Sequence, residues 1–163
     1  MPSIKFELPE DWIRGLNDVS RDFDNILEDT LHAGAEVIEK KMRSNLTNVI
    51  KAGGRSSGQL LGSLGISPSR KNDDGNYDVN VGFNEPRQDK RGVTTYKRKL
   101  KGGKISEYQL TNAMIANILE YGKKGQAPKP FMKPAERATR KAATEAAQSK
   151  FVEVVEGKLK NGG

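Results

Sequence analysis

The chain has 163 residues, enough for one domain with a hydrophobic core but few for two ordinary domains. It carries 28 Lys and Arg residues against 21 Asp and Glu residues, a formal net charge of +7, with no cysteine and one histidine. A disulfide scaffold, a zinc finger, an iron–sulfur protein and a thiol nucleophile are therefore excluded, because each needs cysteine or clustered histidine. No segment approaches the roughly 20 consecutive apolar residues of a membrane span, so we expect no membrane association and a protein that is cytoplasmic or assembles from the cytoplasm.

The first predicted elements are a strand and a long helical region. Apolar and charged residues alternate over 3–8, which predicts a short half-buried strand. From 9 to 51, apolar residues recur every three or four positions, which predicts helix. One helix over this range would be about 64 Å long, whereas a compact chain of this length is only about 40 Å across. We therefore expect either a break, around residues 17–24, or a helix that projects beyond its domain with an apolar stripe that requires a partner.

Short strands are predicted after this helical region. A glycine-rich segment at 53–58 ends the helix, and the apolar pair Leu64 and Ile66 indicates one short strand. A polar turn over 72–76 contains Asp-Gly and is followed by a clearer strand over 77–83. Because Asp-Gly between strands is a strong turn signal, we expect these two strands to form a hairpin.

Residues 84–104 hold most of the positive charge. This segment has eight basic and two acidic residues, so its net charge of +6 is almost the whole excess of the chain. The basic residues are Arg87, Lys90, Arg91, Lys97, Arg98, Lys99, Lys101 and Lys104. Residues 93–96 favour a β conformation and Gly102-Gly103 favours a turn, which together predict a mobile basic loop or β-arm.

Two further helices are predicted in the last third of the chain. Ser106 and Gln109 have the spacing of a capping box, so we expect a helix from there to Gly122, which occupies a C-cap position. A proline-rich bend at 128–134 precedes a last helix from about 134 to 160. Its predicted inner stripe begins with small residues and ends with large ones: Ala135, Ala138, Ala142, Ala146, Phe151, Val155 and Leu159.

This order of elements predicts an α+β fold. We expect a long N-terminal helical region and a C-terminal helix packed on a small, mainly antiparallel sheet, with the basic segment as a loop or β-arm. The expected organisation is one domain over residues 1–163, in which 84–104 is an arm or insertion and 161–163 is a flexible tail.

Few residues suggest catalysis, a cofactor or a metal. His32 lies in the middle of a predicted helix with no motif for nucleophilic catalysis around it. Acidic residues on the first helices suggest either a magnesium site or a solvated face, and the interleaved basic residues favour the solvated face. Gly53 and Gly58 have the spacing of a phosphate loop, but Gln59-Leu60 stands where that loop needs Lys and Ser or Thr. We therefore predict no catalytic residue, no cofactor and no metal site.

The basic arm allows two interpretations. Its cations, with Tyr96 among them, could follow a nucleic-acid backbone, as in a small module that binds DNA without sequence specificity through residues 87–104. Alternatively, the arm is a solvated loop or contacts an acidic partner protein. Outside 84–104 the chain is nearly neutral, so its charge describes a local arm and not a DNA-binding fold.

Glu120 is unusual for its position. It lies in the last turn of a predicted helix, where the helix dipole disfavours a negative charge. It is either a surface residue without a role or the partner of a lysine or arginine, within the fold or across a subunit interface.

Three further motifs occur in a fixed order along the chain. Residues 57–64 read Ser-Gly-Gln-Leu-Leu-Gly-Ser-Leu, residues 118–122 read Ile-Leu-Glu-Tyr-Gly, and residues 130–135 read Pro-Phe-Met-Lys-Pro-Ala. Over residues 19–160, their order and spacing resemble the tail-completion, or head–tail joining, proteins of long-tailed bacteriophages, also grouped as minor tail proteins. Ser57 stands where that family usually has Thr. The basic arm looks like an enlargement, so its role cannot be inherited from the family.

The resemblance implies a non-enzymatic virion protein that assembles as a ring in the phage neck and joins the tail to the head. The ring would contact neighbouring neck and tail-tube proteins and let DNA pass through, and such tails suggest six-fold symmetry. During assembly the protein would be in the host cytoplasm.

The residues that match the three motifs are Ser57, Gly58, Leu60, Ser63, Glu120, Tyr121, Gly122, Pro130, Phe131 and Pro134. We expect architectural roles for them instead of direct ligand contact. Gly58 would let the chain turn, Ser63 would satisfy backbone groups, and Phe131 would be a fixed apolar plug between prolines.

Overall fold

The computed structural model describes residues 10–53, 58–83, 86–89 and 92–161. Its helices are α1 (Glu10–Arg21), α2 (Phe23–Gly53), α3 (Gln59–Gly62), α4 (Asn112–Tyr121) and α5 (Met132–Asn161). Its strands are β1 (Leu64–Ile66), β2 (Arg70–Lys71), β3 (Tyr77–Asp78), β4 (Val81–Phe83), β5 (Gln88–Asp89), β6 (Gly92–Val93), β7 (Thr95–Lys99) and β8 (Ile105–Gln109). The fold is α+β, as predicted, with long N-terminal and C-terminal helices and small antiparallel sheets. The strand predicted over 3–8 lies outside the described residues, as do 162–163 of the predicted tail, whereas Asn161 is the last residue of α5.

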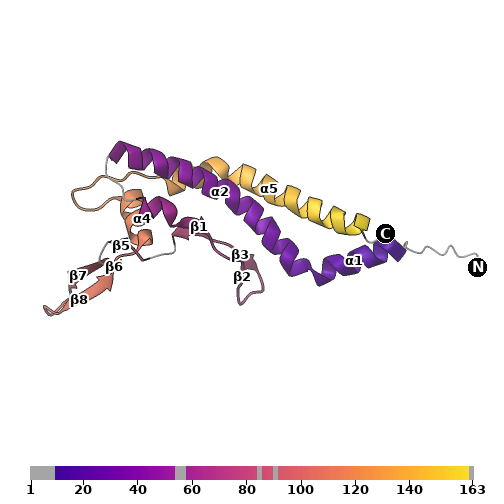
Figure 1. Cartoon of the computed structure of the whole chain (residues 1–163), viewed down its shortest axis with the longest axis horizontal. Helices are drawn as coiled ribbons and strands as arrows, with labels where there is room; N and C mark the ends of the chain where they lie inside the picture. The colour runs from indigo at the N-terminus through magenta and orange to yellow at the C-terminus, as the bar shows by residue number, and fades with distance from the viewer. Residues whose placement is uncertain (1–9, 54–57, 84–85, 90–91, 162–163) are drawn as a thin grey trace, which may run out of the picture.

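The long N-terminal helical region is broken at Asp22, inside the range predicted for a break. The helices α1 and α2 meet there at an angle (Figure 1). Lys158 on α5 donates a hydrogen bond of 2.7 Å to the Asp22 carboxylate. This bond and the lysine charge hold the pKa of Asp22 below its ordinary value. The C-terminal part of α5 is therefore attached to the corner between the first two helices.

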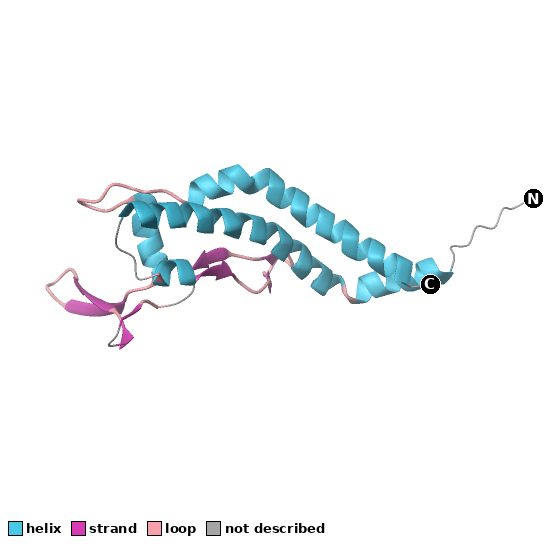
Figure 2. Cartoon of the chain, turned by 45° about the horizontal axis from the view of Figure 1, so that its top comes forward, coloured by secondary structure: helices cyan, strands magenta, loops and turns pink. Residues whose placement is uncertain are grey.

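Helices α2 and α5 run antiparallel and lie side by side over most of their length (Figure 1, Figure 2). Glycines on the N-terminal helices allow the close approach. A Cβ atom built at Gly34 would lie 3.0 Å from the carbonyl oxygen of Ala143 on α5. A Cβ atom built at Gly15 would lie 2.9 Å from the Cα atom of Leu159. The backbones are thus close enough that a larger residue at either position requires the helices to move apart.

The buried stripe of α5 differs from the predicted one. Ala135, Thr139 and Ala143 are buried, whereas Ala138, Ala142 and Phe151 are exposed, so the predicted stripe is wrong at those three positions. Thr139 can be buried because its hydroxyl donates a hydrogen bond of 2.8 Å to the carbonyl oxygen of Ala135. Alanines are frequent on several sides of this helix, and composition alone therefore does not identify the face that packs.

Replacing Gly34 with valine is expected to lower the free energy of unfolding by about 1–3 kcal/mol, because the new side chain meets the α5 backbone. The matched control is Gly157→Ala, since nothing lies within 4 Å of a Cβ atom at this position. Alanine is expected to stabilise α5 there by up to about 1 kcal/mol. Urea unfolding followed by circular dichroism measures both changes, and equal effects of the two substitutions would contradict the close α2–α5 contact.

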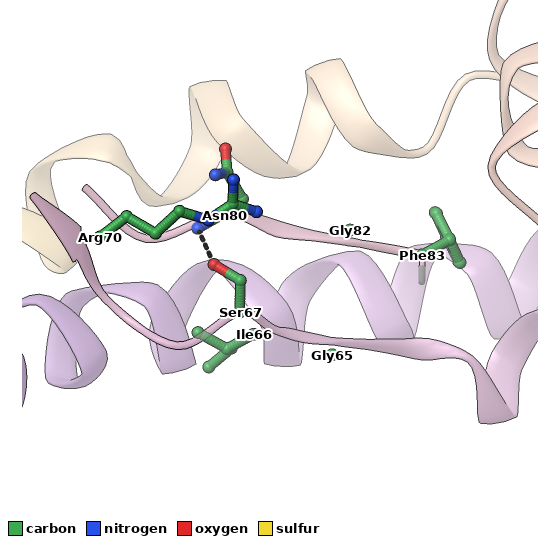
Figure 3. A pocket seen from close by; sticks show the side chains of 7 residues that line it. All are labelled: Gly65, Ile66, Ser67, Arg70, Asn80, Gly82 and Phe83. Carbon is green, nitrogen blue, oxygen red and sulfur yellow. Dashed lines mark hydrogen bonds between the residues drawn. The ribbon is translucent and has the colours of Figure 1, made fainter. Parts of the chain in front are cut away.

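Residues 64–83 form one antiparallel hairpin with a single interruption. The strands β1 and β4 pair, as do β2 and β3, but the registers of the two pairs differ by one residue. The extra residue lies on the first strand near Pro68, which has no N–H to donate. At the interruption, the Ser67 N–H donates to the Asn80 carbonyl (2.8 Å), and the Ser67 hydroxyl accepts from the Asn80 N–H (2.9 Å; Figure 3). The hairpin is confirmed, but the single strand predicted over 77–83 is two short strands because of this shift in register.

The helix predicted from Ser106 begins at Asn112 instead, so the capping-box prediction is wrong. Residues 105–109 form β8, which pairs antiparallel with β7. The residue that caps α4 is Thr111, whose hydroxyl accepts a hydrogen bond of 3.2 Å from the Met114 N–H. The spacing of Ser106 and Gln109 does not predict the start of a helix here, because both residues belong to β8, which pairs with β7.

Candidate functional site

The three sequence motifs meet near one end of the α2–α5 pair, around the side chain of Phe131. This residue directly precedes α5 and is completely buried. Its ring lies edge-on to the ring of Phe83, with 6.0 Å between the ring centres and an angle of 74° between the planes. The buried core cluster consists of Met42, Leu46, Leu60, Leu64, Ala116, Phe131 and Ala135. Phe131 therefore packs where α2, α3, β1, α4 and α5 come together.

The first motif forms the short helix α3 and the turn into β1. Leu60 is buried in the core cluster, and the buried Ser63 hydroxyl donates a hydrogen bond of 3.0 Å to the Leu60 carbonyl oxygen. Gly58 precedes α3 with a φ of 75°, a conformation that favours glycine. Ser57 lies outside the described residues.

Glu120, in the second motif, caps a helix other than its own. It lies near the C-terminal end of α4, is 3% exposed, and accepts hydrogen bonds from the backbone N–H groups of Phe131 (2.7 Å), Met132 (2.8 Å) and Lys133 (2.9 Å). N–H groups at the start of a helix such as α5 have no partner inside the helix. Of the alternatives that the sequence left open, a specific partner within the fold is the one observed, but that partner is a helix N-terminus and not a lysine or arginine side chain.

The charge of Glu120 is stabilised in this position. Burial opposes ionisation of the carboxyl group, but the three backbone N–H groups and the Lys133 ammonium favour the carboxylate. Together they hold the pKa of Glu120 below its ordinary value. The carboxylate also faces the positive end of the α5 dipole, which offsets its unfavourable place near the end of α4.

Gly122 ends α4 and turns the chain towards the proline-rich bend. Its N–H donates a hydrogen bond of 2.9 Å to the Ile118 carbonyl oxygen, as expected for a C-cap, and its φ is 77°. A Cβ atom built at Gly122 would lie 2.8 Å from the Gln126 carbonyl oxygen and 3.0 Å from the Pro128 nitrogen. Both the backbone conformation and the space therefore require glycine at this position.

The remaining motif residues are on the surface. Tyr121 is 60% exposed, and the Lys133 ammonium lies 4.8 Å from the centre of its ring. Pro130 and Pro134 are also exposed, on either side of the buried Phe131. These residues lie around the start of α5 on the solvent side, whereas Glu120 and Phe131 contact the start of α5 from the protein interior.

We call the place where α2, α3, β1, α4 and α5 meet around Phe131 the junction. Sequence reasoning missed two polar residues of α2 that hold the junction together. Arg43 donates hydrogen bonds of 2.9 Å to the carbonyl oxygens of Leu61 and Leu64, and Asn45 donates one of 3.1 Å to the carbonyl oxygen of Phe131. Glu39 accepts from the Arg43 Nε atom (2.7 Å) and orients the guanidinium group. No motif marks these residues, because a polar residue beside buried positions of a helix is usually solvated.

Replacing Arg43 with methionine is expected to lower the free energy of unfolding by about 1–2 kcal/mol, because two backbone carbonyl groups lose a charged donor. The control is Lys40→Met on the same helix, whose ammonium makes only a long, exposed contact of 3.9 Å with Glu36. Thermal unfolding compares the two variants. If Lys40→Met is as destabilising as Arg43→Met, the bonds to Leu61 and Leu64 do not contribute.

The second half of the predicted basic arm, together with residues 105–109, forms a projecting two-stranded ribbon. We call residues 95–109, the β7–β8 hairpin, the basic ribbon (Figure 1). The Tyr96 and Tyr108 rings stack across it, with 5.6 Å between their centres. Its exposed cations are Lys97, Arg98, Lys99, Lys101 and Lys104, and none of them forms an ion pair with another described residue.

The other basic residues of the predicted arm are not on this ribbon. Arg87 is half-buried near the ribbon's base, where its N–H donates to the Leu110 carbonyl oxygen (2.7 Å) and its guanidinium group lies 3.5 Å from the Asn112 amide oxygen. Lys90 and Arg91 lie outside the described residues. The eight predicted contact residues therefore do not form one surface in the described part of the chain.

The described residues offer little for catalysis or metal binding. Among them, no group of three or more histidine or acidic side chains is placed to hold a metal ion. His32 is half-buried on α2, with its Nε2 atom 3.9 Å from a carboxylate oxygen of Glu28. Asp18 pairs with Arg21 on α1, as expected for a solvated face. No helix in the described ranges is long and apolar enough to cross a membrane.

Among the hollows that the described residues line, one of about 530 Å³ is an open depression over Arg137, Arg140 and Lys141 on α5. Two others lie elsewhere. One, of about 240 Å³, lies on the interrupted hairpin between Ile66, Arg70 and Phe83 (Figure 3). The other, of about 480 Å³, is an open apolar groove between α2 and α5 that Phe151 and Val152 line. None of these three hollows contains a constellation of groups that would carry out chemistry.

The chain matches a protein-family model described as "Bacteriophage HK97-gp10, putative tail-component" over residues 10–122. This match covers more than two thirds of the chain. The chain belongs to this family. The HK97-gp10-like tail-component family confirms the resemblance to phage tail proteins seen in the sequence motifs. No curated protein and no solved structure matched the chain.

The tail-component match ends at Gly122, after the second motif. It therefore includes the glutamate that caps α5 but not the buried phenylalanine or α5 itself. The structure joins these parts through the bonds from Phe131, Met132 and Lys133 to Glu120.

Proposed function

We propose that this chain is a non-enzymatic structural protein of the phage virion that assembles as a ring in the neck and joins the tail to the head. Membership in the HK97-gp10-like tail-component family carries this proposal. The ring would contact neighbouring neck and tail-tube proteins, with DNA passing through it. The chain would act by assembly, from the host cytoplasm into the virion.

Exposed apolar residues support an assembly role. Leu16, Phe23 and Val152 are 45–51% exposed on α1, α2 and α5. Large apolar side chains that remain in water on a monomer are typical of surfaces that a partner covers. The small core of the junction is consistent with a protein that gains stability when copies associate.

Disrupting the gene in the phage that encodes this chain tests the proposal. Electron microscopy of lysates is expected to show DNA-filled heads and complete tails that are separate, and supplying the wild-type chain is expected to restore joined particles. Joined, infectious particles formed without the chain would contradict the proposed function.

The alternative is a small module that binds DNA without sequence specificity, and the exposed cations of the basic ribbon favour it. Gel retardation of double-stranded DNA at low salt tests it. The alternative requires binding that is lost when Lys97, Lys99 and Lys101 are changed to glutamine. Unchanged DNA mobility with wild-type protein would exclude it.

A further inference from the structure

The basic ribbon lacks the packing that would stabilise it within one copy of the chain. It projects from the end of the molecule that holds the junction, in both views (Figure 1, Figure 2). Ile105 is 64% exposed, Tyr108 40% and Leu100 36%. An isolated two-stranded hairpin is only marginally stable in water. The ribbon therefore has the properties of an element that becomes stable on a partner.

The side chains of the ribbon indicate the chemistry of that partner. The ladder places Lys99 opposite Ile105 and Lys97 opposite Glu107, so lysines and an exposed isoleucine share one face. Lys101 adds a further cation in the turn. A phosphate backbone would satisfy the cations but offers no apolar contact to Ile105. A protein surface that carries carboxylates fits both features.

Such a surface lies elsewhere on the same chain, on a second projecting hairpin. We call residues 70–78, the β2–β3 hairpin, the acidic hairpin, because Asp73, Asp74 and Asp78 are exposed on it. Its two basic residues lie on β2 and not at the turn: Arg70 is opposite Asp78 in the ladder, and the Lys71 ammonium lies over the Tyr77 ring, 5.2 Å from the ring centre. The turn between the strands therefore presents only acidic charge.

The acidic hairpin is ordered by its own bonds. In the turn, the Asn72 side-chain oxygen accepts from the Asn76 N–H (2.9 Å), and the Asn72 N–H donates to the Asn76 carbonyl oxygen (2.8 Å). At the base, interaction with the Asp24 carboxylate on α2 holds the pKa of the Tyr77 hydroxyl above its ordinary value. The carboxylates of the turn are thus held in place before any partner arrives, which lowers the entropic cost of docking.

Both hairpins project from the side of α2 that faces away from α5, but at different positions along the molecule (Figure 1, Figure 2). No hydrogen bond or ion pair joins the basic ribbon to the acidic hairpin among the described residues. Contact between the two therefore requires two copies. Since the two surfaces differ, the contact is head-to-tail, and repeated head-to-tail contacts produce a ring or a filament.

We propose that the basic ribbon of one copy docks on the acidic hairpin of the next copy, and that this contact connects the subunits of the ring. The inference rests on the proposed function and adds the surfaces that recognise each other. Lysines of the ribbon pair with carboxylates of the turn, and Ile105 and Leu100 lose contact with water.

Carbodiimide coupling in purified phage tails tests this contact, because the reagent joins lysine amines to carboxylates that touch. Three full-length variants are compared with wild type: Lys97→Glu with Lys99→Glu and Lys101→Glu, Asp73→Lys with Asp74→Lys, and all five together. The control reverses three exposed lysines of another loop, Lys123, Lys124 and Lys129. Incorporation of each variant into tails is measured before coupling by quantitative mass spectrometry.

Wild type and the loop control are expected to give a ladder of coupled multimers on a denaturing gel. Each one-sided reversal is expected to reduce incorporated, coupled multimer by about tenfold, because like charges then face each other, and the five-residue exchange is expected to restore it. Peptide mapping is expected to place couplings between residues 97–104 and residues 73–78.

Two results would overturn the inference. If the chain is present in tails but the ladder is insensitive to reversal of the acidic hairpin, the ribbon docks elsewhere and only the proposed function stands. Loss of DNA retardation in the ribbon variant alongside that result would assign the ribbon to DNA. If the wild-type chain is absent from tails, the proposed function fails and the inference fails with it.

Discussion

Replacing Phe131 with alanine is expected to lower the free energy of unfolding by about 3–5 kcal/mol, the loss typical of a fully buried phenylalanine. The side chain is completely buried and packs edge-on against Phe83. Its removal would leave a cavity between α2, α4 and α5, and these elements cannot close it without losing the bonds to Glu120. Since small domains are stable by only about 5–15 kcal/mol, this loss is a substantial part of the total stability, and a clearly lower unfolding midpoint is expected.

Urea and thermal unfolding measure this effect, with Phe151→Ala as the matched control. Phe151 is 36% exposed on α5, so its truncation is expected to cost about 1 kcal/mol or less. An unchanged unfolding midpoint in Phe131→Ala, or equal losses in the two variants, would show that Phe131 is not the centre of the core cluster.

Replacing Glu120 with alanine is expected to lower the free energy of unfolding by about 3 kcal/mol, because three buried N–H groups lose a charged acceptor. Glu120→Gln keeps one acceptor oxygen but removes the charge, so a smaller loss of about 1–2 kcal/mol is expected. The control is Glu136→Gln, a glutamate of α5 whose side chain is 57% exposed. Its loss is expected to be within about 0.5 kcal/mol.

The contribution of Glu120 is expected to depend on pH. Its pKa in the folded protein lies below its ordinary value, so the folded state holds the proton less tightly than the unfolded state. The carboxylate therefore stabilises the fold fully above the ordinary pKa of about 4.3, and this stabilisation is lost as the pH falls through the lowered folded pKa. Unfolding free energies of wild type and Glu120→Gln are expected to differ at pH 7 and to converge in acid.

Urea titrations at pH 7, 4 and 3 measure this convergence. A gap between wild type and Glu120→Gln that stays constant across these values would contradict a role for the charge of Glu120. If Glu136→Gln reproduces the convergence, the effect would belong to general surface charge and not to the cap of α5.

The long helices could be predicted from the sequence, because their apolar residues recur every three or four positions where one face of the helix is buried. Length alone allowed either a break or a projecting helix, because an unbroken helix would exceed the size of a compact chain, and the structure has the break, at Asp22. The β1 strand and the turn before β3 follow from short apolar and Asp-Gly signals. Local motifs are less reliable: Ser106 has the spacing of a cap, but pairing of β8 with β7 determines its conformation.

The site could be predicted only in part, because its key bonds join distant segments. Glu120 is visible in the sequence as an acidic residue at an unfavourable helix end, but nothing there indicates that its partners are the N–H groups of residues 131–133. Arg43 and Asn45 likewise have no signal, since their acceptors are backbone carbonyl groups. The side of α5 that packs was predicted only in part correctly, because alanines occur on more than one face.

Electron cryomicroscopy of purified virions tests the central claim most directly, namely that this chain forms a ring between head and tail. We expect ring-shaped density in the neck that accommodates the long α2–α5 pair in every subunit, with basic ribbons directed at adjacent acidic hairpins. A neck in which all density is accounted for by other proteins, together with the absence of this chain from the virion by mass spectrometry, would contradict it.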